Sequence, residues 1–125
     1  MLSVNTMYVA LPVKDLKEAR DFYGKTLNLN VVDENENGLW FQTGQSRIVV
    51  YQSEFTGSNQ ATAAIWEVTD PESTVNALTR QGIIFERYED LPGVKLKGDL
   101  HIFGAYTAAW FKDPFGNIIC ITHHL

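Results

Sequence analysis

The stretch AWFKDPFGNII, residues 109–119, decides the fold. Its first residues end an alternating segment, 105–112, which predicts a β-strand. Asp113-Pro114-Phe115-Gly116-Asn117 contains the residue types that dominate tight turns. The aliphatic segment that follows, 117–124, predicts a second strand. These residues therefore predict two neighbouring strands joined by a short turn.

A longer series of elements precedes this stretch. Alternation at period two over residues 7–13 predicts a strand. Asp15 has the position of a helix N-cap, and Glu18 follows three residues later, as in a capping box. Apolar residues then recur at helical spacing over 16–27, although Gly24 weakens the last turn. Three more strands are predicted over residues 29–34, 39–43 and 47–52, with a hairpin signal at Asn37-Gly38.

The same series then begins again. Residues 61–68 predict a strand, Asp70 and Pro71 predict the start of a helix, and Gly82 predicts its end. Residues 83–88 predict a further strand and residues 91–100 a loop.

The two halves correspond in detail. Val13-x-Asp15 matches Val68-x-Asp70, and Trp40-Phe41 matches Trp110-Phe111. A longer loop near 89–103 accounts for the difference in spacing between these matches. We therefore predict an α+β fold of two βαβββ modules, residues 1–57 and 58–125, within one domain that spans 1–125.

Composition and charge exclude several classes of function. The 125 residues carry 10 Lys and Arg against 15 Asp and Glu, a formal net charge of −5. Without a basic patch, the chain is poorly suited to bind nucleic acid or an anionic membrane. Cys120 is the one cysteine, so no internal disulfide is possible. With no signal peptide and no apolar stretch of membrane-spanning length, we expect a cytoplasmic protein.

The stretch VKDLKEARDFYGKTL, residues 13–27, resembles the first-module signature of the vicinal oxygen chelate superfamily. This superfamily comprises glyoxalases, bleomycin resistance proteins and extradiol dioxygenases. Residues 109–119 resemble its second-module signature. The resemblance implies that each module curls its sheet into half of a cup, with the helices on the outer face. It also implies, in metal-dependent members, His, Gln or Glu ligands on the first and last strands of each module.

Transferred residue by residue, those ligand positions fall on Tyr8, Tyr51, Ala63 or Ala64, and Cys120. Mg²⁺, Mn²⁺, Ni²⁺ and Fe²⁺ sites use carboxylates and imidazoles, which this set lacks. Zn²⁺ accepts a thiolate but needs further good ligands. We therefore predict no metal and no cofactor at the family position, and a displaced metal site stays an alternative.

Period-two alternation predicts which side chains face the cup. The predicted ligand-binding residues are aromatic or apolar with a few polar groups, as in most small-molecule pockets. They are Tyr8, Tyr51, Ile65, Glu67, His101, Tyr106, Trp110 and Cys120. The alternative for the tyrosines is that their rings fill a solid core.

Glu67 and His101 are the candidate catalytic residues. A carboxylate on an inner face would have a raised pKa and act as a base, whereas a strand-end glutamate would lie in water at the rim. His101 lies in the predicted long loop, between Gly98 and Gly104, which would fold over the cup as a lid. The alternative is a histidine on a surface loop.

The sequence leaves three alternative hypotheses for the function. The first is a metal-independent protein that binds a small organic ligand, cationic rather than anionic, and pairs as a homodimer like the bleomycin resistance branch. The second is a lyase, isomerase or dioxygenase that uses Glu67 and His101 or a displaced metal. The third is a protein that only pairs with a partner, its cavity closed by aromatic side chains.

Overall fold

The computed structural model describes residues 1–124 of the chain. Leu125, which the predicted domain includes, lies outside the described residues. The chain divides into two compact units, Met1–Ser58 and the residues from Asn59 onward. We call them unit 1 and unit 2 and describe each by itself. That they form one domain around a shared cup stays a prediction.

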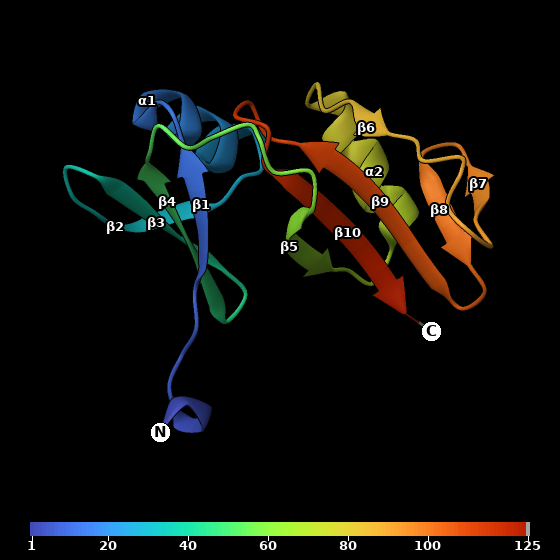
Figure 1. The fold of residues 1–125 in the computed structure, drawn as a ribbon, viewed down its shortest axis with the longest axis horizontal. Helices are drawn as coiled ribbons and strands as arrows, with labels where there is room; N and C mark the ends of the chain where they lie inside the picture. The colour runs from blue at the N-terminus through green and yellow to red at the C-terminus, as the bar shows by residue number, and fades with distance from the viewer. Residues whose placement is uncertain (125) are drawn as a thin grey trace. The chain divides into compact units, whose positions relative to one another are not determined.

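Unit 1 is a four-stranded sheet with a helical segment on one face (Figure 1). The strand order is β1-β4-β3-β2, in which β1 runs parallel to β4 and the other neighbours are antiparallel. Its elements are η1 (Leu2–Val4), β1 (Val9–Val13), α1 (Leu16–Ala19), η2 (Arg20–Thr26), β2 (Asn30–Glu34), β3 (Gly38–Thr43) and β4 (Ser46–Gln52). The predicted βαβββ order is thus confirmed for the first module.

The helix predicted over 16–27 consists of an α-helical segment followed directly by a π-helical segment. The Asp15 carboxylate accepts from the N–H groups of Lys17 and Glu18, which confirms the predicted N-cap. After the α-helical residues of α1, the backbone widens into the π-helical η2. Leu27 N–H accordingly donates to the carbonyl five residues earlier, at 2.9 Å. Gly24 lies inside η2, where its low helix propensity favours departure from regular α-helix.

The core of unit 1 lies between this helical segment and one face of the sheet. Leu11 and Val13 of β1 are buried there, whereas Ala10, which precedes Leu11, is exposed and Pro12, between the two, is half-buried. Phe41 of β3 meets the ring of Tyr23 with centroids 5.8 Å apart. Alternate residues therefore point to a covered face and to an open face, as period two predicts.

Unit 2 has a larger mixed sheet, again with one helix. The order is β5-β10-β9-β8-β7, with the short β6 paired to β9 and with β5 parallel to β10. Its elements are β5 (Thr62–Glu67), α2 (Pro71–Arg80), β6 (Phe85–Glu86), β7 (Lys95–Lys97), β8 (Leu100–Phe103), β9 (Tyr106–Lys112) and β10 (Ile118–His124). Both units mix helix and strand, so the predicted α+β class is confirmed.

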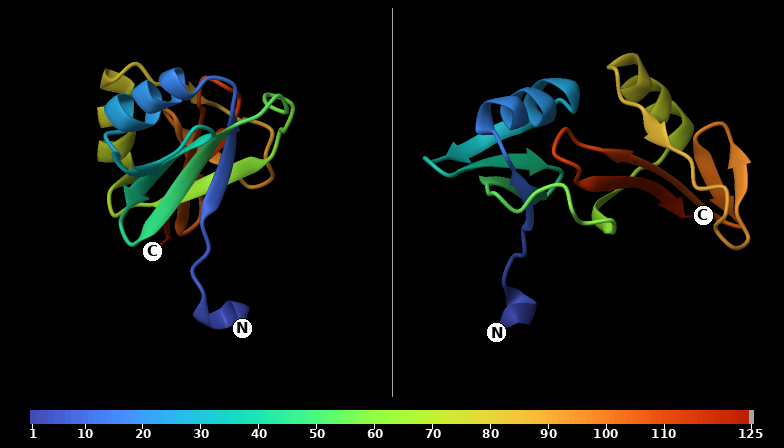
Figure 2. Two further views of the ribbon diagram at one scale, coloured as in Figure 1. Left: turned by 90° about the vertical axis from the view of Figure 1, so that its left-hand side faces the viewer. Right: turned by 45° about the horizontal axis from the view of Figure 1, so that its top comes forward.

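Two predictions for unit 2 are wrong. The predicted loop 91–100 contains β7 and the start of β8, which form an antiparallel hairpin (Figure 2, right view, in orange). Gly98, with φ of +59°, and Asp99 make its two-residue turn. Gly-Asp is a hairpin signal that the sequence analysis overlooked. The predicted strand 83–88 shortens to Phe85–Glu86.

Helix α2 begins and ends where the sequence predicts. The Asp70 carboxylate accepts from Ser73 N–H at 3.1 Å, and Pro71 occupies the first turn. Gly82 follows the helix with φ of +96°, a conformation that favours glycine. The helix packs on β9 and β10, and the apolar core beneath it includes Phe85 and Phe111, whose ring centroids lie 5.5 Å apart.

The predicted turn between β9 and β10 is held by one buried carboxylate. Asp113 is buried and its Oδ1 accepts from the N–H groups of Phe115 and Asn117, both at 2.9 Å. Its Oδ2 accepts from Asn117 Nδ2 at 2.7 Å. This carboxylate therefore fixes the register of the two central strands of unit 2.

We expect Asp113→Ala to lower the free energy of unfolding by roughly 2–4 kcal/mol, because it leaves buried N–H donors without an acceptor. Urea denaturation measures the change. Asp15→Ala is the matched control, since it removes an exposed cap carboxylate and should cost only about 1 kcal/mol. Equal losses for the two variants would contradict the role given to Asp113.

Candidate ligand-binding site

The face of the unit 2 sheet opposite α2 carries most of the predicted site residues, and we call it the open face. Strand register brings them together. Cys120 pairs with Ile65 on one side and with Trp110 on the other. In the next row on the same face, Thr122 pairs with Glu67 and with Ala108. His101 of β8 lies beside Ala108 in that row.

Three aromatic rings form a cluster on the open face. Trp110 meets Tyr88 at 5.3 Å and His101 at 4.9 Å between ring centroids, both edge to face. Tyr88 and His101 lie 5.7 Å apart. Trp110 is fixed further by its Nε1–H, which donates to Thr62 Oγ1 at 3.2 Å across the sheet. Tyr88 and Trp110 are half-buried, so each ring keeps part of its surface in solvent.

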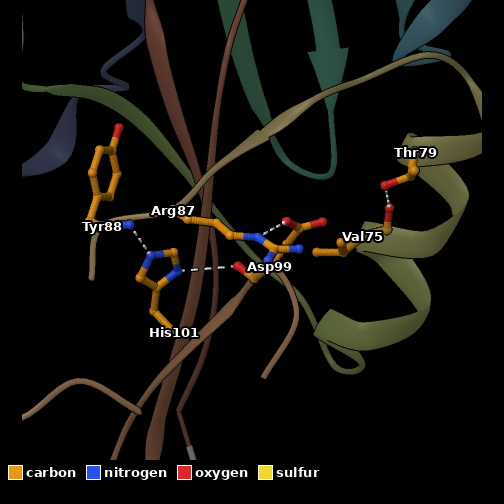
Figure 3. A network of polar contacts seen from close by, with 6 residues as sticks. All are labelled: Val75, Thr79, Arg87, Tyr88, Asp99 and His101. Carbon is orange, nitrogen blue, oxygen red and sulfur yellow. Dashed lines mark hydrogen bonds and ion pairs between the residues drawn. The ribbon is translucent and has the colours of Figure 1, made fainter. Parts of the chain in front are cut away.

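His101 is fully buried beneath the cluster, and both of its ring nitrogens bond the main chain (Figure 3). Tyr88 N–H donates to Nε2 at 2.9 Å, so Nε2 carries no proton. The proton is therefore on Nδ1, which donates to the Asp99 carbonyl at 3.2 Å. In this arrangement His101 has no nitrogen left to receive a proton or to bind a metal. Its location on a loop, as lid or as surface residue, was predicted wrongly.

The side chain of Asp99 extends the same network. Its Oδ1 accepts from Arg87 Nε at 3.0 Å, next to the residue that His101 holds (Figure 3). Asp99, in the turn of the β7–β8 hairpin, thus accepts a hydrogen bond from His101 at its carbonyl and one from Arg87 at its carboxylate. The hairpin that the sequence analysis missed therefore supports Tyr88.

Two groups on the open face are held in their neutral forms. Burial raises the pKa of the Cys120 thiol to about 11. Burial, followed by the charge of Glu86, also raises the pKa of Tyr88 above its usual value of 10.0. At neutral pH the site therefore presents a thiol and a phenol rather than a thiolate and a phenolate.

Ile65, Glu67 and Tyr106 surround the cluster. Ile65 is 62% exposed, which is high for a large apolar residue on a strand. Glu67 is the last residue of β5 and is exposed. It therefore corresponds to the strand-end glutamate in water, and not to the buried carboxylate with a raised pKa. Tyr106 is half-buried and lies near Phe103 and His124, with ring centroids 6.5 Å and 6.2 Å away.

Unit 1 carries the other two predicted residues on its own open face. Tyr8 and Tyr51 are 43% and 40% exposed, so neither ring fills a core. The Arg47 guanidinium lies 6.0 Å from the centroid of the Tyr8 ring. Tyr51 pairs with Pro12, four residues beyond Tyr8, so the two tyrosines are separated by about 13 Å along the strands.

The donors at the family's metal-ligand positions do not fit a metal. Within residues 1–124, no group of three or more His, Cys, Asp or Glu side chains is placed to hold an ion. The raised pKa of Cys120 opposes the thiolate form that coordination requires. Ala64 supplies no side-chain donor, and Tyr8 and Tyr51 lie too far apart along their strands to share one ion.

Sequence reasoning missed Tyr88 and Thr62. Tyr88 lies beyond the end of β6 and reaches the open face only through its bond to His101, so alternation alone does not place it. Thr62 shares a face with Trp110 because the β5–β10 register shifts between Ile118 and Ile119. A bulge of this kind changes which residues face one way and leaves no clear sequence signal.

Most of the chain matches a known protein superfamily. The profile of the Glyoxalase/Bleomycin resistance protein/Dioxygenase superfamily matches residues 6–121. The chain therefore belongs to this superfamily, as the resemblance of residues 13–27 and 109–119 predicted. No curated protein matches the sequence.

Solved structures share the fold at low sequence identity. A glyoxalase family protein from Bacillus anthracis has a TM-score of 0.74 at 22% identity, over 97% of this chain and 95% of that one. Lactoylglutathione lyase from Agrobacterium tumefaciens has a TM-score of 0.70 at 16% identity, over 96% and 93%. The fosfomycin resistance protein FosX from Mesorhizobium loti has a TM-score of 0.69 at 10% identity, over 98% and 93%. Within residues 1–124, no helix has the length and apolar character needed to cross a membrane.

We expect His101→Ala to lower the free energy of unfolding by roughly 3–4 kcal/mol, because it leaves a cavity and an unpaired Tyr88 N–H. His101→Phe is the matched control, since it keeps a ring but removes the acceptor, and should cost about 1–3 kcal/mol. Urea denaturation separates the two. A Phe variant as stable as the unmodified protein would show that the hydrogen bonds contribute nothing.

We expect Cys120 to react slowly with a thiol reagent in the folded protein. At pH 8 a thiol of pKa about 11 is roughly 100-fold less ionised than one at 9.0. Reaction with dithionitrobenzoate should therefore be at least ~100-fold slower in buffer than in urea. Because folding favours the thiol form, its contribution to stability should persist below pH 9 and disappear as pH rises towards 11. Equal rates in buffer and urea would contradict the buried thiol.

Proposed function

We propose that this protein binds a small planar organic molecule on the open face of unit 2. The observation that carries the proposal is the cluster of Tyr88, Trp110 and His101, in which two rings keep exposed surface and the third is held rigidly below them. Aromatic rings fixed in this way stack on planar ligands at little conformational cost. The exposed side chain of Ile65 adds apolar surface beside them.

Binding without a metal is the second part of the proposal. The supporting observations are the donor set at the family's ligand positions and the raised pKa of Cys120. The site then depends on stacking and on neutral hydrogen-bond donors, among them the Tyr88 hydroxyl. An enzyme of the same superfamily would need a proton acceptor in the site. Both nitrogens of His101 are engaged, which leaves the exposed Glu67 as the candidate base.

A positively charged ligand is favoured over an anion. Glu67 shares the open face with the cluster, and Glu86 pairs with Trp110 in the strand register. Lys112 lies 3.6 Å from Glu86 and offsets one of these charges. The chain as a whole carries a formal net charge of −5, which attracts cations at long range. A cytoplasmic location and a homodimer also belong to this proposal.

We expect a planar monocation, proflavine, to bind the purified protein, with a fluorescence change that persists in excess EDTA. Trp110→Ala should weaken the binding about 10-fold or more, because it removes the largest ring of the cluster. Trp66→Ala is the matched control, since Trp66 alternates with Ile65 and points to the other face of β5. Fluorescein, a planar anion, should bind less tightly than proflavine.

Several outcomes would contradict the proposal. Loss of proflavine binding in EDTA would mean that a metal takes part. Equal losses in the Trp110 and Trp66 variants would remove the open face as the site. Turnover of 2-oxoaldehyde–thiol adducts or catechols that requires Glu67 would favour a lyase or dioxygenase instead.

A further inference from the structure

A groove on unit 2 lies between α2 and the turn of the β7–β8 hairpin. Its volume is about 320 Å³, which is at the lower end of the range for small-molecule sites. Figure 3 shows its two sides, with the Val75 side chain pointing from α2 towards Asp99 of the hairpin. The lining residues are Glu72, Val75 and Asn76 of α2 and Lys97, Gly98, Asp99 and Leu100 of the hairpin. The groove therefore shares no lining residue with the aromatic cluster of the open face.

The groove combines an apolar floor with a charged rim. Val75 and Leu100 are only 5% and 8% exposed, so both belong to the core beneath the groove. At the rim, Lys97 Nζ lies 3.8 Å from Glu72 Oε2, and the two side chains are 68% and 61% exposed. Exposed ion pairs of this kind contribute little to stability. A ligand that offers each side chain a new partner can therefore separate Glu72 from Lys97 at small cost.

Asp99 and Asn76 add further polar groups to the lining. The Asp99 side chain is 26% exposed, and its Oδ1 accepts from Arg87 Nε at 3.0 Å. A carboxylate can accept about four hydrogen bonds, so this bond leaves acceptor capacity on Asp99. The Asn76 amide offers both donors and an acceptor. The groove thus holds two carboxylates, one ammonium group and one amide above apolar side chains.

These groups define the chemistry of a ligand. The carboxylates of Glu72 and Asp99 favour a positively charged donor, and the Lys97 ammonium favours a negatively charged acceptor. Since Glu72 and Lys97 are only 3.8 Å apart, the two charges of the ligand must also lie close together. The apolar floor favours a small apolar substituent. A free α-amino acid carries all three groups on one carbon atom.

Other classes of ligand match the groove less well. A phosphate or another anion would meet two carboxylates and only one lysine, which is unfavourable. A simple amine would leave Lys97 without a partner once Glu72 had turned to the ligand. Within residues 1–124, Glu72 and Asp99 belong to no group of three or more His, Cys, Asp or Glu side chains that could hold a metal ion.

We propose that this groove binds a free α-amino acid with a small apolar side chain. Glu72 and Asp99 receive its ammonium group, and Lys97 binds its carboxylate. The side chain of the amino acid packs on Val75 and Leu100. Because the charged groups of the rim are solvated, the affinity is modest, with a dissociation constant on the order of 1 mM. The proposal does not depend on what binds the open face, since the lining residues are different.

A titration of the isotope-labelled full chain with L-leucine, followed by two-dimensional NMR, tests this proposal. We expect the main-chain amide signals of Asn76 and Gly98 to shift with a dissociation constant on the order of 1 mM. N-acetylleucine lacks the ammonium group, 3-methylbutylamine lacks the carboxylate, and 6-aminohexanoate holds its two charges far apart. Each of these three compounds should bind about 10-fold more weakly or worse, because it loses a charged contact.

Variants of the rim locate the contacts. Lys97→Gln and Glu72→Gln should each weaken the binding of leucine about 10-fold. The matched control is Lys95→Gln, since Lys95 is an exposed residue of the same strand that does not line the groove. The control should change the dissociation constant less than about 3-fold. The NMR spectrum of each variant also shows whether it is folded, which is expected because all three side chains are exposed.

The outcomes are distinct. An absence of shifts at about 50 mM leucine, or shifts centred on Tyr88 and Trp110 instead of the groove, would overturn the proposal. Equal binding of the three analogues, or an equal effect of Lys95→Gln and Lys97→Gln, would overturn it as well. Shifts of the groove amides that Lys97→Gln weakens support the amino acid site, whatever the result of the proflavine titration.

Discussion

In each unit one helical segment covers one face of a sheet, and this constraint determines where a site can lie. Because side chains alternate across a strand, burying one face against a helix leaves the opposite face without a helix of its own unit to cover it. The covered face takes the aliphatic residues, such as Leu11 in unit 1 and Ile119 in unit 2. The other face is then available for side chains whose rings and polar tips meet a ligand.

The aromatic cluster on the open face of unit 2 is supported by the β7–β8 hairpin and by the edge strand β5. The β7–β8 hairpin brings Asp99 and His101 against the main sheet, and His101 bonds Tyr88 through its main-chain N–H. Tyr88 in turn meets Trp110, which is tethered to the edge strand β5 by Thr62. The rings of Trp110 and His101 are therefore fixed by hydrogen bonds, and Tyr88 is fixed at its main-chain N–H, so the cluster is held rigidly. Rigidity of this kind reduces the entropic cost of binding.

The sequence predicts the fold well because its signals are local. Asp15, Asp70 and Gly82 act at helix ends, and Asp113 acts within a five-residue turn, so each is visible in a short window of residues. The β7–β8 hairpin is also local, but its Gly98-Asp99 signal lies in a polar segment without strong alternation. The second module has more residues than the first near 89–103, and comparison of the two halves favoured a loop for these residues. The hairpin was therefore not predicted.

The site is harder to predict because its contacts are long-range. The predicted positions of Ile65, Trp110 and Cys120 on one face follow from alternation, and the register brings them together. The state of His101 does not follow from alternation. It depends on a main-chain N–H thirteen residues away, which converts a candidate acid–base group into a neutral support for Tyr88. Chemistry on this fold therefore has to be argued from the hydrogen bonds of each side chain, because the fold alone does not determine what a histidine does.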